Sequence, residues 1–290
     1  LLNIVLNFLL IYPTRPAVLF GAQITIPGAG LGAAGAAIAS AAALTTAGIA
    51  LLRIGTRQGE RFRVHLREGL RPDGAIIRQA VRLGLPSAVE RATINLGQIA
   101  TTAVVASLGT VSLAANQIAV TAEGLCYLPA YGISYAGIAL VGQAVGARKK
   151  EDARAYGTLA AKLGFVVAIG TASALFLLAP PLAGLFNSDP RVVEQAALML
   201  RIVAFCEPFF ALSIILSGTL RGAHDVRLPM VVGLVCMWGI RVPLAPVLVY
   251  FAGFGLAGVW LAMDVDLIVR GLLCALRWRS GKWARMCGLE

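Results

Sequence analysis

The chain alternates between long apolar stretches and short polar loops. Apolar residues dominate eight stretches, at 1–13, 31–52, 76–107, 111–145, 157–182, 194–218, 228–251 and 254–276. A helix needs about 20 mostly apolar residues to cross a bilayer, so most of these stretches predict membrane spans. The first is too short, and the third and fourth are long enough to include an interfacial turn or a tilted end. The pattern predicts an all-α, polytopic transmembrane helix bundle of about eight segments.

Basic residues lie on every second loop. The segment 53–78 holds seven arginines, the 146–156 loop holds four basic residues, and the chain from Arg277 onward holds four more. The loops between them, such as 108–110 and 252–254, carry no charge. Cytoplasmic loops are enriched in Lys and Arg. We therefore expect a multi-pass protein of the plasma membrane with its basic loops and its C-terminus in the cytoplasm.

The composition fits a membrane protein and excludes several other classes. Hydrophobic residues make up 58% of the chain and charged residues 13%, unlike soluble domains. The net charge of +11 is accounted for by the cytoplasmic loops, so no nucleic-acid partner is expected. The five cysteines and two histidines show no metal-ligand spacing, and no nucleophile lies beside a base. We expect neither an enzyme nor a bound metal or cofactor.

One motif occurs twice, 223 residues apart. Residues 30–39 and 253–262 both read G-x-G-x-A-G-x-x-(I/L)-A. Each copy opens the second helix of a pair that ends in a basic segment, and an even number of helices separates the copies, which is typical of parallel repeats. The helices at 76–218 would then have partners upstream of residue 1. This predicts a twelve-helix protein of two bundles, with roughly 150 residues before this chain.

Four stretches carry a family resemblance. They are 84–86 with 104–109, 113–118 continuing to 140–147, 216–225, and 255–260. In order and spacing they resemble the C-terminal two thirds of a multidrug and toxin extrusion (MATE) transporter. The resemblance divides the chain into the end of an N-terminal bundle (1–52, the fifth and sixth helices), a cytoplasmic linker (53–75), a C-terminal six-helix bundle (76–276) and a basic cytoplasmic tail (277–290).

The resemblance implies a secondary active transporter in the membrane lipid, monomeric at full length. It would export drug-like organic compounds, cationic or amphipathic, by antiport with sodium ions or protons. Two alternatives stay open. One is a lipid-linked saccharide flippase of the same superfamily, which would need several arginines for phosphate. The other is a non-transporting scaffold or enzyme subunit of the membrane.

Polar side chains inside the membrane are the candidate site, because they are costly there. Helical spacing places Asn3 and Asn7 on one face, and Asn116 and Glu123 on another. The resemblance implies that the first pair lines a cation-linked pocket, although relatives have Asp at the second position. The candidates for the substrate and cation pocket are Asn3, Asn7, Asn95, Gln98, Asn116, Gln117 and Glu123.

Gating or structural roles are assigned to Glu90, Glu207 and Arg241. Glu90 is expected to pair locally with Arg91 near the membrane surface, and a pair between Glu207 and Arg241 is geometrically allowed. Asp266 and Arg270 are four residues apart, which favours a structural ion pair.

The resemblance also points to two absences. Some relatives have carboxylates where this chain has Ile94 and Phe210. A titratable coupling residue is therefore expected on a helix upstream of residue 1 rather than in the C-terminal bundle.

Overall fold

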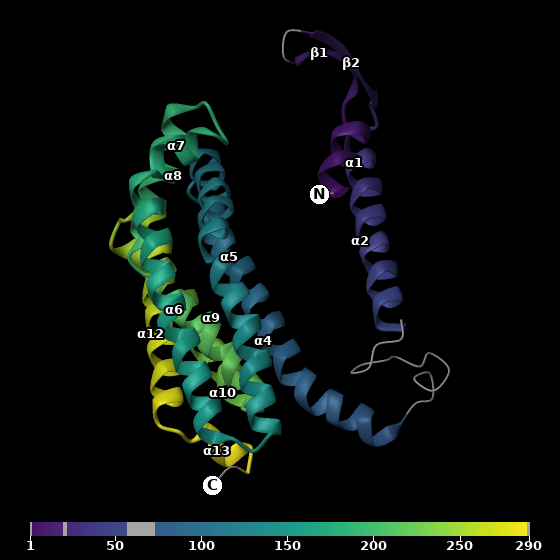
Figure 1. Cartoon of the computed structure of the whole chain (residues 1–290). Helices are drawn as coiled ribbons and strands as arrows, with labels where there is room; N and C mark the ends of the chain where they lie inside the picture. Colours follow the sequence, from purple (N-terminus) through teal and green to yellow (C-terminus); the bar gives the residue numbers. More distant parts are fainter. Residues whose placement is uncertain (1, 20–21, 57–72, 289–290) are drawn as a thin grey trace. The chain divides into compact units, whose positions relative to one another are not determined.

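The computed structural model describes residues 2–19, 22–56 and 73–288. Its contacts divide the chain into two compact units, Leu1–Ile77 and Arg78–Glu290, which are described one at a time. Helices form nearly all of both units (Figure 1), so the predicted helical class is confirmed. Most of the predicted linker 53–75 lies outside the described residues.

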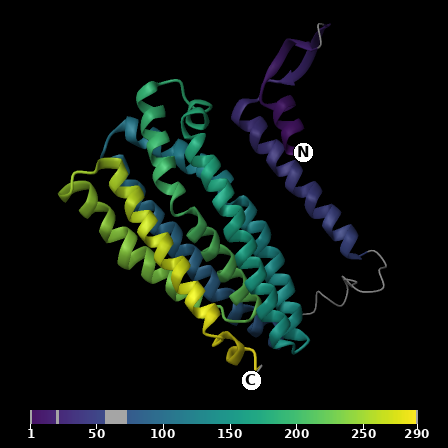
Figure 2. The same cartoon turned by 60° about the vertical axis from the view of Figure 1, so that its left-hand side comes forward.

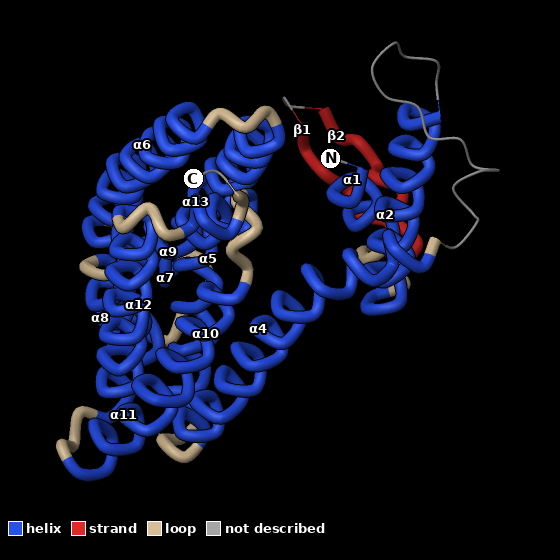
Figure 3. Tube along the Cα trace, turned by 90° about the horizontal axis from the view of Figure 1, so that it is seen from below, coloured by secondary structure: helices blue, strands red, loops and turns tan. Residues whose placement is uncertain are grey.

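Unit 1 is a helix pair joined by a β-hairpin. Helix α1 spans Leu2–Leu10 and helix α2 spans Gly32–Thr56. Between them, β1 (Pro13–Leu19) and β2 (Ala22–Ala29) pair in antiparallel register, with Pro13 opposite Ala29. Figure 3 shows this hairpin in red. The sequence analysis left 14–30 as a loop, yet β2 holds the alternating Ile-Thr-Ile that strands favour.

The repeated motif has the same backbone geometry in both copies. Gly30 and Gly32 have φ angles of 65° and 54°, and Gly253 and Gly255 have 72° and 53°. These left-handed values strain any residue with a Cβ atom. Helix α2 begins at the second glycine of one copy, and helix α12 (Gly255–Arg279) begins at that of the other.

The third glycine of each copy lets two helices approach closely. A Cβ atom on Gly35 would lie 2.5 Å from the carbonyl oxygen of Leu10, and one on Gly258 would lie 2.9 Å from the carbonyl carbon of Leu248. Four residues after these glycines, Ala39 and Ala262 have no exposed surface. The internal repeat is therefore confirmed in the structure as well as in the sequence.

Unit 2 is a bundle of long helices, seen from a second side in Figure 2. Helix α4 enters it from residue 78 onward, and α5, α6, α9 and α12 pack around one another. Its elements are α4 (Gly74–Ala106), α5 (Thr110–Gly146), α6 (Lys150–Leu177), α7 (Ala179–Gly184), α8 (Pro190–Ala204), α9 (Glu207–Gly222), α10 (Arg227–Cys236), π-helix η1 (Met237–Arg241), α11 (Val242–Pro246), π-helix η2 (Val247–Phe251), α12 and α13 (Trp283–Met286).

The predicted span 194–218 is wrong as a single helix. The chain bends by 58° between α8 and α9, because Pro208 lacks the N–H that an uninterrupted helix would need. Among the described residues, four helices are long and apolar enough to cross a membrane: α2, α5, α6 and the run from α10 to η2. The bent pair α8–α9 would make a fifth. Both α4 and α5 are unbroken, so neither contains the expected interfacial turn.

The charged residues of α12 and the polar ones of α4 lower the hydropathy of those two helices. They are nevertheless continuous over 25 and 33 residues. Membrane helices of this kind turn their polar side chains toward the interior of the bundle. The functional site is therefore sought where α4 and α12 face their neighbours.

Small residues set the distances between these helices. A Cβ atom on Gly222 of α9 would lie 2.7 Å from the carbonyl oxygen of Ile138 on α5, and one on Gly271 of α12 would lie 2.4 Å from that of Phe209 on α9. Backbones can approach this closely only where no side chain intervenes. The stretch 216–225, quoted above for the family, thus places Arg221 at a tight crossing of α5 and α9.

Candidate functional site

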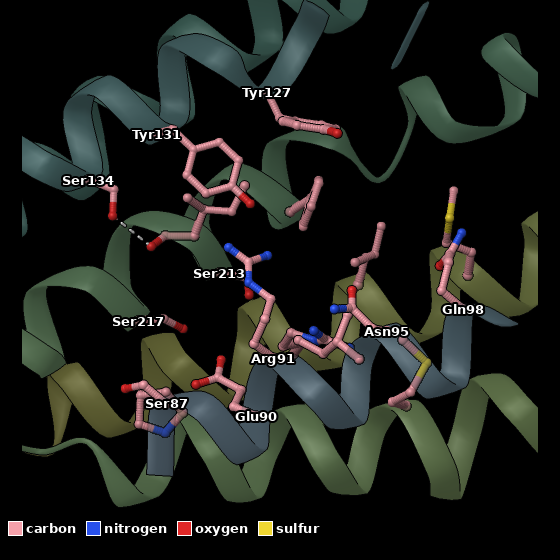
Figure 4. Close-up of a pocket in the computed structure, with 18 of the residues that line it drawn as sticks. Ser87, Glu90, Arg91, Asn95, Gln98, Tyr127, Tyr131, Ser134, Ser213 and Ser217 are labelled. Atoms are coloured by element: carbon pink, nitrogen blue, oxygen red, sulfur yellow. Dashed lines mark hydrogen bonds between the residues drawn. The ribbon is translucent and has the colours of Figure 1, made fainter. Parts of the chain in front are cut away.

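A cavity of about 530 Å³ lies inside unit 2. Its walls come from α4, α5, α9, the α10–η1 segment and α12, and Figure 4 shows part of its lining. Of the predicted pocket residues, Asn95, Gln98 and Glu123 line it, as do the gating candidates Glu90 and Arg241. A space of this size between helices is typical of a site for a small organic molecule.

The α4 wall of the cavity is a polar stripe. Ser87, Arg91, Asn95 and Gln98 all line it, and their spacings of four, four and three residues place them on one helix face. In Figure 4 the Arg91 side chain reaches from α4 into the space below Tyr131. The stripe presents hydrogen-bond donors along the length of the cavity.

The wall opposite, on α5 and α9, is aromatic. Tyr127, Tyr131 and Tyr135 of α5 and Phe210 of α9 line the cavity. The ring of Tyr127 packs edge-to-face on Tyr131 and Phe210, with centroid distances of 5.7 and 5.4 Å. Such packed rings form a rigid apolar surface. The sequence analysis noted Phe210 only as the place of a missing carboxylate and did not predict this wall.

Glu90 pairs with a residue far away in the sequence. Its two carboxylate oxygens accept hydrogen bonds from Nη2 of Arg221 on α9 at 2.8 and 2.7 Å. The expected local pair with Arg91 is therefore wrong. A contact between neighbours on a helix was the simplest assumption, but the glycine-mediated crossing of α5 and α9 brings Arg221 closer.

Asp266 binds two arginines at the centre of the bundle. Its side chain is fully buried and accepts hydrogen bonds from Nη2 of Arg270 at 2.8 and 2.9 Å, so the expected i, i+4 pair is confirmed. Nη1 of Arg241 lies 3.9 Å from the same carboxylate. Arg241 thus pairs with Asp266 of α12 and not with Glu207. The π-helix η1 ends at Arg241, as is frequent at functional positions.

Three further carboxyl groups are buried near one another. Glu123, Glu207 and Asp264 have 6%, 1% and 8% of their surface exposed. Electrostatic interactions link Glu123 to Asp264 and Arg241, and Glu207 to both other acids. One oxygen of Glu207 and one of Asp264 have no hydrogen-bond partner within the described residues. We call these three residues the carboxyl cluster.

The carboxyl cluster is not arranged as a metal site. No group of three His, Cys, Asp or Glu side chains in the described part of the chain could hold a metal ion. Each carboxyl group can still bind a proton by itself. Sequence reasoning considered these acids singly, because the turn at Cys206 and the twist of α12 that bring them together leave no local signal.

The remaining candidates of this bundle take different positions. The side-chain oxygen of Asn116 accepts a hydrogen bond from Nε1 of Trp260 at 3.1 Å, in a buried contact between α5 and α12. Gln117 is exposed and lies outside the cavity lining. Asn116 thus packs helices together, and Gln117 is not brought into the site.

The asparagine pair of unit 1 faces α2. Nδ2 of Asn7 donates to the side-chain oxygen of Asn3 at 2.9 Å, and Nδ2 of Asn3 donates to Oγ of Ser40 at 3.2 Å. The two residues therefore share one face, as their spacing predicts. Their hydrogen bonds hold α1 against α2, and the buried oxygen of Asn7 has no partner among the described residues.

Comparison with known proteins connects this arrangement to one family. The MatE family model matches residues 86–247. The chain is 31% identical over 227 residues to a protein named probable multidrug resistance protein NorM from Thermotoga maritima, covering 78% of this chain and 49% of that protein. It is 30% identical over 285 residues to the uncharacterized transporter YisQ of Bacillus subtilis, covering 98% of this chain and 60% of that protein.

Solved structures have the same fold. A crystal structure of MATE in the bent conformation superposes with a TM-score of 0.79 at 20% identity, covering 99% of this chain and 61% of that one. A MATE in complex with MaD3S superposes with a TM-score of 0.81 at 22% identity, covering 97% and 60%. The chain spans about half to three fifths of the length of these relatives. With the family model matching more than half of its residues, the chain belongs to the MatE family.

Proposed function

We propose that the protein is a secondary active exporter of amphipathic organic compounds, driven by the inward flow of protons. The membership in the MatE family and the relatives named multidrug resistance proteins support transport of this kind. The single observation that carries the coupling step is the carboxyl cluster, which is buried beside a cavity large enough for a drug-like molecule.

Protons are the ion that suits the carboxyl cluster best. Three like charges in a low-dielectric interior repel one another, and Arg241 is shared with Asp266. Bound protons would remove this repulsion one carboxyl group at a time. Sodium would need several oxygens converging on one point, and the cluster does not supply them as it stands. Sodium antiport remains the alternative that the experiment below separates.

Arg241 connects the carboxyl cluster to the cavity wall. It interacts electrostatically with Glu123 and Asp264 and lines the cavity itself. Protonation of the cluster weakens its hold on Arg241. The segment that follows contains Pro243, Pro246 and the π-helix η2, and prolines and π-turns leave backbone groups that rearrange easily. A proton can thus change the shape of the substrate space in alternating access.

The test uses substrate efflux in proteoliposomes under a pH gradient or a sodium gradient. In the Glu123→Gln variant we expect efflux driven by the pH gradient to fall at least tenfold, while downhill substrate movement persists. Glu194→Gln is the matched control, because Glu194 is exposed on α8. Efflux that follows sodium and not pH in the unmodified protein would contradict proton coupling.

The expectation that the coupling residue lies upstream of residue 1 stays a prediction. It rested on Ile94 and Phe210 and did not consider the three acids together. If Glu123→Gln, Glu207→Gln and Asp264→Asn all retained proton-driven efflux, the upstream position would be favoured instead. The plasma-membrane location, the cytoplasmic C-terminus and the monomeric state likewise stay predictions.

One observation favours the flippase alternative. Arg91, Arg221, Arg241 and Arg270 all line the cavity, whereas Arg201 lies over the ring of Phe176 on another face. Three of the four are paired with acids, which leaves a less cationic space than a lipid diphosphate would require. Transport that depends on an added lipid-linked saccharide would identify a flippase.

A further inference from the structure

One charged side chain of the cavity has no partner. Arg91 lines the space and makes no ion pair or hydrogen bond within the described residues. Its neighbour Glu90 is bound to Arg221 through both carboxylate oxygens. The charges that act on Glu123 are those of Arg241 and Asp264. Neither acid of the cavity lining therefore neutralises Arg91.

An unpaired arginine inside a membrane bundle is costly unless it has a use. Guanidinium binds carboxylate and phosphate groups through two parallel hydrogen bonds. Ser87 and Asn95 lie one turn before and after Arg91 on the same face, so further donors are at hand. The polar stripe of α4 is thus suited to a planar anionic group.

The opposite wall determines what that group is attached to. Tyr127 and Tyr131 present packed rings across the cavity from the stripe, and Figure 4 shows Tyr131 directly above Arg91. Flat aromatic molecules stack or pack edge-to-face on such rings. A ligand with a ring system against α5 and a carboxylate against α4 satisfies both walls at once.

We propose that Arg91 recognises the carboxylate of an aromatic organic acid or zwitterion, which makes such molecules substrates of the cavity. The proposal deepens the exporter function and rests on it. Arg91 is a binding residue here and has no part in proton coupling, which is assigned to the carboxyl cluster. A purely cationic compound would bind without using Arg91.

The experiment measures binding without an ion gradient. The probe is a fluorescent xanthene dye with a free carboxylate, compared with the methyl ester of the same dye. Fluorescence anisotropy of the purified protein in detergent gives both affinities. We expect the free acid to bind about tenfold more tightly than the ester, which corresponds to about 1.4 kcal/mol.

The variants separate charge recognition from packing. In Arg91→Gln we expect the affinity for the acid to fall about tenfold with the ester unchanged, and in Arg91→Lys an intermediate value, because Lys keeps the charge without the planar fork. Arg201→Gln is the matched control outside the cavity and should change neither. Equal affinities in the unmodified protein, or equal loss of acid and ester in Arg91→Gln, would overturn the proposal.

Two further outcomes are distinguished. If a short-chain isoprenyl diphosphate bound through Arg91 while the dye acid did not, the ligand would be a lipid phosphate and the carboxylate proposal would fail. If Glu123→Gln retained full proton-driven efflux while Arg91→Gln lost its preference for the acid, the coupling assignment would fail and this inference would hold.

Discussion

Asp266 is the residue on which the interior charges depend. It has no exposed surface and lies between Arg270 and Arg241, at 2.8 and 3.9 Å. Removing the acid would leave two guanidinium groups in a low-dielectric interior without compensation. Breaking a buried pair from one side typically costs about 3–5 kcal/mol. Exposed ion pairs behave differently, because water already screens both charges.

We therefore expect Asp266→Asn to lower the free energy of unfolding by about 3–5 kcal/mol, since the amide cannot balance either arginine. The surface pair of Asp152 with Lys149, at 3.7 Å and about half exposed, is the control. Asp152→Asn should change stability by about 0.5 kcal/mol or less. Denaturant unfolding in detergent, followed by tryptophan fluorescence, gives both values. Similar values for the two variants would show that Asp266 is not a structural counter-ion.

Sequence analysis predicted single residues well where the interaction is local. The pairs Asn3–Asn7 and Asp266–Arg270 follow from helical spacing alone and are present in the structure. Glu90 was assigned to its neighbour because nothing in the sequence encodes a contact 131 residues away. The carboxyl cluster was missed for the same reason, since its three acids come from three helices.

At the scale of elements, glycine determines which helices can touch. Gly271 of α12 faces the backbone of α9 so closely that an added Cβ atom would lie 2.4 Å from the carbonyl oxygen of Phe209. This crossing also positions the α12 face that carries Asp264 and Asp266. The helix pattern predicted these elements from apolar length, but the bend between α8 and α9 and the two π-helices depend on where single prolines fall.

We expect Gly271→Ala to destabilise the protein by about 1–3 kcal/mol, because a methyl group would force α9 and α12 apart. Gly170→Ala on α6 is the control, since a Cβ atom there meets no atom within 4 Å. That substitution should be neutral or slightly stabilising through helix propensity. Thermal unfolding of both variants in the same detergent measures the difference. Equal melting temperatures would contradict the tight crossing.

At the scale of the whole molecule, the order of helices and loops was predicted best. The alternation of apolar stretches and basic loops places the helix ends in the right order along the chain. The β-hairpin of unit 1 was missed, because a short strand pair joining two helices leaves no charge or hydropathy signal distinct from a loop. The repeated glycine motif was recognised from eight letters and is reproduced in the backbone angles of both copies.

The basic loops of unit 2 gather at one end of the bundle. Nε of Arg277 at the end of α12 donates to Asp225 in the α9–α10 loop at 2.8 Å, and Nε1 of Trp278 donates to Oγ1 of Thr158 on α6 at 3.1 Å. Figure 1 shows the C-terminal helix α13 at this same end. Since the positive-inside rule assigns basic loops to the cytoplasm, this whole end is expected to be cytoplasmic.

The orientation can be tested by cysteine labelling in intact cells with a membrane-impermeant maleimide. In a background where Cys287 and Cys126 are replaced by Ser, we expect Lys149→Cys to react only after the cells are permeabilised, because the α5–α6 turn faces the cytoplasm. Ser188→Cys is the matched position in the α7–α8 loop, where the residue is exposed, and it should react from outside. The two loops lie at the ends of one helix pair that crosses the membrane once between them. Labelling of Lys149→Cys before permeabilisation, with Ser188→Cys protected, would reverse the topology and with it the direction assigned to proton flow.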